Sequence, residues 1–135
     1  MLRKTKKVTQ LVIADDNPRA LHGLRAILTS QSGLEVVGEA SQGEEAIALV
    51  EALHPDVALL DVRMPVLDGI QATCTIKKCW PKVRVVLISM YADYQVEALS
   101  AGADAFLVKG CPAEELVTAI LGTQPQKEKK SIGKE

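Results

Sequence analysis

Three aspartates directly follow short apolar runs, where their side chains could act together. Asp15 and Asp16 come after LVIA at residues 11–14, and Asp61 comes after VALL at residues 57–60. If both runs are neighbouring strands of a parallel sheet, the three carboxylates meet at its carboxyl edge. Such a cluster repels itself unless a divalent cation binds, and oxygen ligands favour Mg2+. A carboxylate placed there can also act as a nucleophile toward phosphorus.

Two further polar residues mark the ends of later apolar runs. Ser89 ends RVVLIS, and Lys109 follows AFLV. At the same edge of a sheet, the ammonium group would neutralise an anionic oxygen while the hydroxyl donated a hydrogen bond. Phosphoryl transfer depends largely on fixed electrostatics of this kind. The residue types therefore point to phosphoryl chemistry.

Each of these residues also has a simpler explanation when it is taken alone. Asp15 or Asp16 could cap a helix, and Asp61 could begin a turn. Ser89 also suits a turn, and Lys109 suits an exposed surface. Matched chemistry at four strand ends favours the joint explanation over these separate ones.

The elements that must position these groups alternate regularly along the chain. Unbroken apolar runs, typical of strands covered on both faces, occur at residues 11–14, 34–37, 57–60, 83–88 and 105–108. Helical patterns follow them, including stretches near residues 18–30, 69–79, 92–101 and 113–121. Strict alternation predicts an α/β fold, in which a parallel sheet has right-handed crossovers and helices on both faces.

Capping residues mark the starts of the first two helices. Asn17 precedes Pro18, which fits the first helical position. Ser41, with Glu44 three residues later, predicts a capping box for the second helix. That helix is expected to stop at residues 54–55, where a proline follows a histidine.

Composition limits the classes of protein and partner. The 135 residues are enough for one domain, and an aliphatic core is expected because aromatic residues make up only 3%. A net charge of -1 gives no general attraction to nucleic acid or anionic membrane. Three cysteines without CxxC spacing, and no targeting or membrane-spanning segment, predict a cytoplasmic protein. Residues 1–8 are expected to be a flexible N-terminal tail and residues 122–135 a polar linker or tail.

The motifs IADD, LLDVRMPVLDG, VLISM and GADAFLVK resemble the receiver domains of bacterial two-component response regulators across residues 9–121. The phrases LISMYADY and FLVKGCPAEEL resemble the NarL/LuxR-type subfamily in particular. This resemblance implies a CheY-like, flavodoxin-like (βα)5 three-layer sandwich. Its five parallel strands would lie in the order 2-1-3-4-5.

The resemblance also implies a set of metal ligands around the phosphoacceptor. Asp61 would accept the phosphoryl group. Asp16 and Asp61 would be direct ligands of Mg2+, and the main-chain carbonyl of Arg63 would supply another. Asp15 would act mostly through water.

By the same resemblance, Ser89 and Lys109 would sense the phosphoryl group. Phe106 occupies the place of an aromatic switch residue on the fifth strand, although a lone aromatic there also suits ordinary core packing. Arg63 and Tyr91 flank the site, in positions expected to tune hydrolysis.

The expected function is a signalling switch rather than a metabolic enzyme, with only self-catalysed phosphorylation and slow autodephosphorylation. Its donor would be a phosphohistidine on a sensor histidine kinase or phosphotransfer protein. Its output would be a changed contact with an effector domain or a second copy of the chain. No helix-turn-helix pattern follows residue 121, so a transcriptional regulator's DNA-binding domain is expected to be absent and this chain alone is not expected to bind DNA.

Three other functions fit the alternating pattern less well. A haloacid-dehalogenase-like phosphatase also uses a strand-end aspartate and Mg2+, but no DxD follows the first or third run. A flavodoxin would need a hydroxyl-rich phosphate loop where this chain has carboxylates. An interaction module without phosphorylation would be favoured only if Asp16 or Asp61 failed to bind metal.

Overall fold

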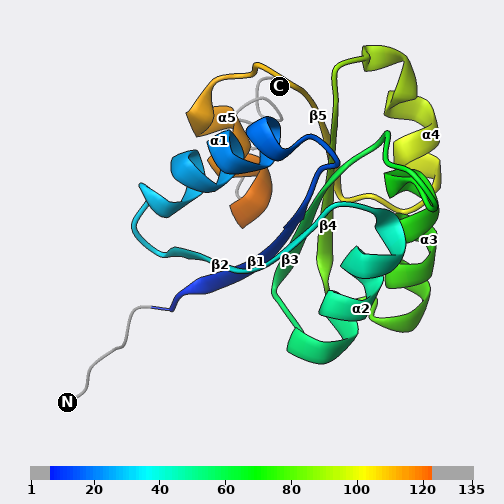
Figure 1. Cartoon of the computed structure of the whole chain (residues 1–135), viewed down its shortest axis with the longest axis horizontal. Helices are drawn as coiled ribbons and strands as arrows, with labels where there is room; N and C mark the ends of the chain where they lie inside the picture. The colour runs from blue at the N-terminus through cyan, green and yellow to red at the C-terminus, as the bar shows by residue number, and fades with distance from the viewer. Residues whose placement is uncertain (1–6, 123–135) are drawn as a thin grey trace, which may run out of the picture.

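Five strands alternate with helices along residues 7–122, which the computed structural model describes (Figure 1). The strands are β1 Thr9–Ala14, β2 Leu34–Ala40, β3 Val57–Asp61, β4 Arg84–Ser89 and β5 Ala105–Val108. The helices are α1 Pro18–Thr29, α2 Gly43–Leu53, α3 Gly69–Cys79, α4 Gln95–Ser100 and α5 Ala113–Leu121, with a 3-10 turn, η1, at Ala92–Tyr94. The tails predicted at residues 1–8 and 122–135 lie largely outside the described residues.

All strand pairs are parallel, and the order is β2-β1-β3-β4-β5. The predicted fold class and strand order are therefore confirmed. In the register of the sheet, Ala14 lies opposite Leu60, and Ser89 lies opposite Val108. This register brings the ends of four strands to the same edge of the sheet.

Helices cover both faces of the sheet, as Figure 1 shows. On one face, α2, α3 and α4 bury residues such as Val50, Ile76 and Ala98 against the sheet. On the other face, α1 and α5 contribute Leu28 and Ile120 to a second core. Every residue of β3 is buried, because both layers cover it. The unbroken apolar runs of the sequence reflect this double coverage.

The two predicted helix caps have different outcomes. The side chain of Asn17 accepts hydrogen bonds at the start of α1, as expected. The capping box predicted at Ser41 and Glu44 is wrong, because Gln42 caps α2 by accepting from the main-chain N–H of Glu44 at 2.7 Å. Ser41 instead donates to the Glu45 carboxylate through both its main-chain N–H and its hydroxyl. The chain therefore enters the helix one residue later than the sequence pattern suggested.

The fourth helix is shorter than predicted. Residues 92–94 form a 3-10 turn, and the α-helix covers only Gln95–Ser100. No side chain caps the start of this segment, and its first turn tightens to i→i+3 bonding. Gly102, with φ of 105°, turns the chain toward β5 just after the helix ends.

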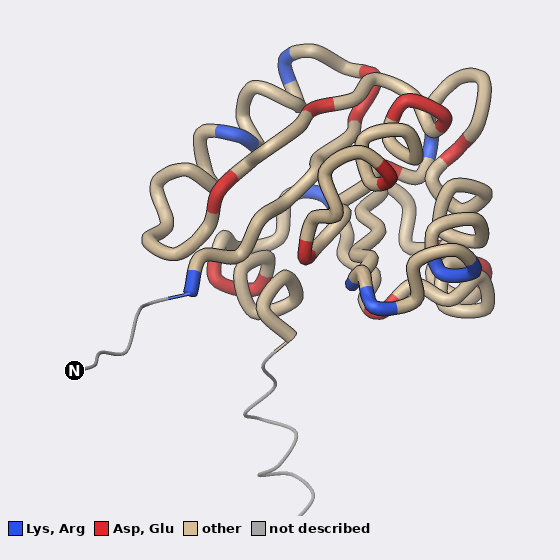
Figure 2. The backbone as a smooth tube through the Cα atoms, turned by 90° about the horizontal axis from the view of Figure 1, so that it is seen from below, with Lys and Arg blue, Asp and Glu red and all other residues tan. Residues whose placement is uncertain are grey.

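Charged residues are distributed over many elements. Figure 2 shows blue and red segments interleaved along the tube rather than gathered into one basic face. Acidic residues outnumber basic ones over residues 7–122, whereas the whole sequence is nearly balanced with 16 basic and 17 acidic residues. Among residues 7–122, no helix has the length and apolarity that a membrane crossing requires.

Close backbone packing at Gly69 connects α3 to the end of β3. A Cβ atom on this glycine would lie 2.2 Å from the carbonyl oxygen of Asp61, which cannot move without shifting the strand. We therefore expect Gly69→Ala to lower the free energy of unfolding by about 2–3 kcal/mol. Gly23→Ala is the matched control, since nothing lies within 4 Å of its added Cβ. It should raise stability by about 0.5–1 kcal/mol through helix propensity. Urea denaturation measures both changes, and equal stabilities for the two variants would contradict this packing.

Candidate phosphoryl-acceptor site

Three carboxylates meet at the carboxyl edge of the sheet. Asp15 and Asp16 follow β1, and Asp61 ends β3, its neighbour in the sheet. One oxygen from each lies within 4.8 Å of the others, which is close enough to share one cation. Asp15 and Asp61 are only 3% and 6% exposed, whereas Asp16 is exposed. The strand-end clustering predicted from sequence is thus present in the structure.

Lys109 reaches this cluster from the end of β5. Its Nζ atom lies 2.7 Å from Oδ2 of Asp15 and 3.4 Å from Oδ1 of Asp61. Burial lowers the pKa of Lys109, but the hydrogen bond to Asp15 and the negative charge of Asp61 outweigh it, so the net shift is upward. The ammonium group is therefore held charged beside two of the three carboxylates.

The surroundings of Asp61 disfavour its ionised form. Burial and then the charge of Asp15 raise its pKa to about 6, against the opposing effect of Lys109. The charge of Asp16 adds a smaller upward contribution. Asp61 is thus a buried carboxylate whose ionised form would gain from a bound cation.

Ser89 lies at the same edge of the sheet, and its hydroxyl oxygen already accepts one hydrogen bond. The side chain is only 1% exposed, and its Oγ accepts a hydrogen bond from the main-chain N–H of Tyr91 at 3.0 Å. Its own hydroxyl hydrogen remains able to donate to a ligand. The main-chain N–H of Lys109 donates to the carbonyl of Ser89 at 2.8 Å. The two predicted phosphoryl-sensing residues are therefore joined through the backbone.

Phe106 lies on β5, opposite Leu87 of β4. It is partly buried and packs against the core on the side of α2, α3 and α4. It also lines a surface cavity together with Gln95 and Lys109. Its assignment as a switch residue stays a prediction.

The loop from β3 to α3 closes the site on one side and is fixed by main-chain bonds. The main-chain N–H of Gly43 donates to the carbonyl of Leu67 at 2.9 Å, and the N–H of Gly69 donates to the carbonyl of Val62 at 2.8 Å. Within this loop Val66 has a φ of 69°, a rare conformation for a β-branched residue. The main-chain N–H of Leu67 donates to the carbonyl of Pro65 at 2.7 Å, which closes a tight turn around Val66. The carbonyl of Arg63, the predicted metal ligand, belongs to this fixed loop.

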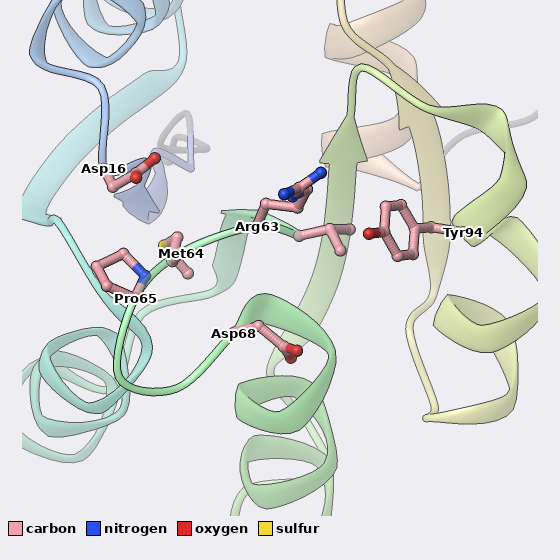
Figure 3. Close-up of a pocket in the computed structure, with 7 residues that line it drawn as sticks. Asp16, Arg63, Met64, Pro65, Asp68 and Tyr94 are labelled. Atoms are coloured by element: carbon pink, nitrogen blue, oxygen red, sulfur yellow. The ribbon is translucent and has the colours of Figure 1, made fainter.

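Tyr91 and Tyr94 form an aromatic wall beside the site. The sequence pattern indicates Tyr91 but not Tyr94. The Arg63 guanidinium lies 5.8 Å from the ring centroid of Tyr91, which packs edge to face on Tyr94. A cavity of about 460 Å³ opens between Asp16 and Tyr94, as Figure 3 shows. Asp68 lines its lower side and also caps α3.

Sequence could have revealed one of the missed residues. Asp68 precedes Gly69, and Gln71 lies three residues on, which is a capping-box pattern. No comparable local pattern marks Tyr94, because its contact with Tyr91 depends on how the 3-10 turn folds back.

Comparison with known proteins shows the family to which the chain belongs. Residues 11–121 match the response regulator receiver domain. The chain belongs to this family. It is 40% identical over 110 residues to the uncharacterized transcriptional regulatory protein YhcZ of Bacillus subtilis, covering 80% of this chain and 51% of that protein. The chain spans about half the length of the curated relatives it matches.

Solved receiver structures have the same fold. The receiver domain of the response regulator NarL from Mycobacterium tuberculosis matches with a TM-score of 0.81 and 37% identity, covering 86% of this chain and 95% of that one. CheY in a CheX-CheY-BeF3-Mg2+ complex from Borrelia burgdorferi matches with a TM-score of 0.77 and 27% identity, covering 84% and 87%. The similarity to NarL/LuxR-type regulators predicted from sequence is confirmed.

The raised pKa of Asp61 leads to a prediction about stability. In the unfolded chain this carboxyl titrates near 3.8, and in the folded chain near 6. Ionised Asp61 therefore lowers stability fully above pH 6, and the loss disappears as pH falls toward 3.8. Without divalent cations, Asp61→Asn should raise the free energy of unfolding at pH 7.5 by about 1–3 kcal/mol, and by about half as much at pH 5.

The matched control for this measurement is Asp93→Asn, which changes an exposed aspartate in η1. Its stability should stay within about 0.5 kcal/mol of the parent chain at both pH values. Urea unfolding at the two pH values gives the comparison. A destabilised Asp61→Asn chain at pH 7.5 would contradict the electrostatic account of the site.

Proposed function

We propose that this chain is a phosphoryl-accepting switch of a two-component system, with Asp61 as the acceptor. The observation that carries the proposal is the cluster itself. Three carboxylate oxygens lie within 4.8 Å of one another, and the Lys109 ammonium contacts two of these residues. Membership of the receiver family supports the same conclusion.

The proposed donor is a phosphohistidine on a sensor histidine kinase or phosphotransfer protein. An Asp61 carboxylate oxygen attacks phosphorus, a P–O bond forms, and the P–N bond to the histidine breaks. The departing imidazole keeps the electron pair of that bond. Lys109 contributes positive charge near the phosphoryl oxygens, and the free hydroxyl hydrogen of Ser89 can donate to one of them. The chain therefore takes part in a transfer without acting as a metabolic enzyme.

The donor atoms of the cluster fit Mg2+. Asp16 and Asp61 would be direct ligands, together with the main-chain carbonyl of Arg63. Both oxygens of Asp15 already have partners, because Oδ1 accepts from the N–H of Asn17 and Oδ2 from Lys109. This arrangement supports an indirect role for Asp15 through water. When bound, Mg2+ supplies positive charge that offsets the crowded carboxylates and the phosphoryl oxygens.

Support for Mg2+ also comes from a relative. The matching CheY structure from Borrelia burgdorferi is named as a complex with BeF3 and Mg2+. A phosphoryl group on Asp61 would carry nearly two negative charges and several acceptor oxygens. Lys109 and Ser89 would respond to it, and their backbone link would carry the change to β4 and β5.

The proposed output is a changed contact between proteins. An effector domain and a second copy of the chain are the two candidate partners. Over residues 7–122 acidic residues outnumber basic ones, so the described part of the chain gives no basis for contact with duplex DNA. Regulation of transcription would then require a separate DNA-binding domain, and YhcZ, about twice as long, is named as a transcriptional regulatory protein.

Mg2+ binding depends on the exposed member of the cluster. Asp16→Asn should weaken Mg2+ binding by about tenfold or more, because one anionic ligand is lost. Isothermal titration calorimetry at pH 7.5 measures the affinity. Asp93→Asn again serves as the control and should leave the affinity unchanged. Equal Mg2+ affinities for the parent chain and Asp16→Asn would remove the metal assignment.

Phosphorylation itself is tested with a small donor. Incubation with acetyl phosphate and Mg2+ should add one phosphoryl group, seen by intact-mass spectrometry, and hydroxylamine should release it as expected for an acyl phosphate. Asp61→Asn should abolish the labelling. Stoichiometric labelling of that variant would show that another residue accepts the group.

A further inference from the structure

The side chain of Asn17 lies at the rim of the acceptor site and has unused hydrogen-bonding capacity. We propose that its amide nitrogen is a positioning group for the incoming phosphoryl group, donating a hydrogen bond to one of its oxygens at Asp61. The inference rests on the proposed function and adds a residue to it.

Hydrogen bonds to the start of α1 and to Asp15 hold Asn17 in place. Its Oδ1 accepts from the main-chain N–H groups of Arg19 at 2.9 Å and Ala20 at 3.3 Å. Its own main-chain N–H donates to Oδ1 of Asp15 at 2.9 Å. Because the oxygen is committed to the start of α1, the orientation of the amide plane is restricted. The side chain therefore loses little further freedom when it meets a ligand.

The side-chain amide nitrogen of Asn17 is the group that remains free to donate. Among residues 7–122, no group accepts a hydrogen bond from it. The same side chain lines a cavity of about 320 Å³ together with Asp61, Ser89 and Lys109. The structure thus places a residue with two unused N–H donors on the wall of the cavity where the phosphoryl group is proposed to bind.

This position complements the donors already described. Ser89 and Lys109 reach the cavity from β4 and β5, whereas Asn17 reaches it from the turn between β1 and α1. A phosphoryl group has several oxygens, so donors from different elements can bind different ones at the same time. The Asn17 donor is also neutral, and it adds no charge to a site that already holds three carboxylates.

Two substitutions separate this role from helix capping. Asn17→Ser and Asn17→Asp both keep an oxygen that can cap α1, and both remove the amide donors. With acetyl phosphate and Mg2+ as the probe, each should slow phosphorylation of Asp61 by about 3- to 10-fold, the effect of losing one hydrogen bond. The urea midpoints of both variants should stay near that of the parent chain. The Mg2+ affinity of Asn17→Ser should equal that of the parent chain.

The outcomes distinguish this inference from the proposed function. A parent chain that is not labelled at Asp61 would overturn both. A labelled parent with an Asn17→Ser rate within twofold of it would overturn the role of Asn17 alone. Slowing of Asn17→Asp without slowing of Asn17→Ser would also overturn it, because added charge would then explain the effect. Slower labelling of both variants at unchanged stability supports the inference.

Discussion

The ion pair between Lys109 and Asp15 holds together an edge of the sheet that would otherwise carry three neighbouring carboxylates without compensation. Lys109 approaches Asp15 at 2.7 Å and Asp61 at 3.4 Å, so a single ammonium group offsets part of the repulsion between two buried acids. The compensation is incomplete, since the pKa of Asp61 remains raised to about 6. An incompletely balanced site of this kind favours added positive charge, and it accounts for the fit to a divalent cation.

Backbone bonds keep the members of this site in register. The N–H of Val62, directly after Asp61, donates to the carbonyl of Ile88 at 3.0 Å, which fixes the end of β3 against β4. The N–H of Lys109 donates to the carbonyl of Ser89, which fixes β5 against β4. Helices on both faces bury these strands, so the polar groups emerge only at the edge. A change in charge at Asp61 therefore acts on strands that are already coupled.

Sequence reasoning predicts most of this arrangement, because strand ends and residue types are local features. The runs that end at Ala14 and Leu60 are unbroken and apolar, so the placement of the aspartates after them follows from sheet geometry alone. The cap of α2 could not be predicted as well, since Ser41 and Gln42 compete and the outcome depends on the contact of Ser41 with Glu45.

The contacts of the aromatic wall beside the site could not be predicted from sequence either. Arg63 and Tyr91 could be placed near the acceptor, but their mutual contact joins two separate loops. Tyr94 joins them only because the segment before α4 folds as a 3-10 turn. The raised pKa of Asp61 likewise depends on burial and on distances between charges, which strand patterns do not provide.

The measurement that tests the central claim most directly is the position of the transferred group. Borohydride reduces an aspartyl phosphate to homoserine, and tandem mass spectrometry of the digested chain then locates the converted residue. After treatment with acetyl phosphate and Mg2+, the account predicts homoserine at position 61 and unmodified aspartate at positions 15 and 16. Conversion at either of those positions in place of Asp61, or a stable phosphate on Ser89, would contradict it.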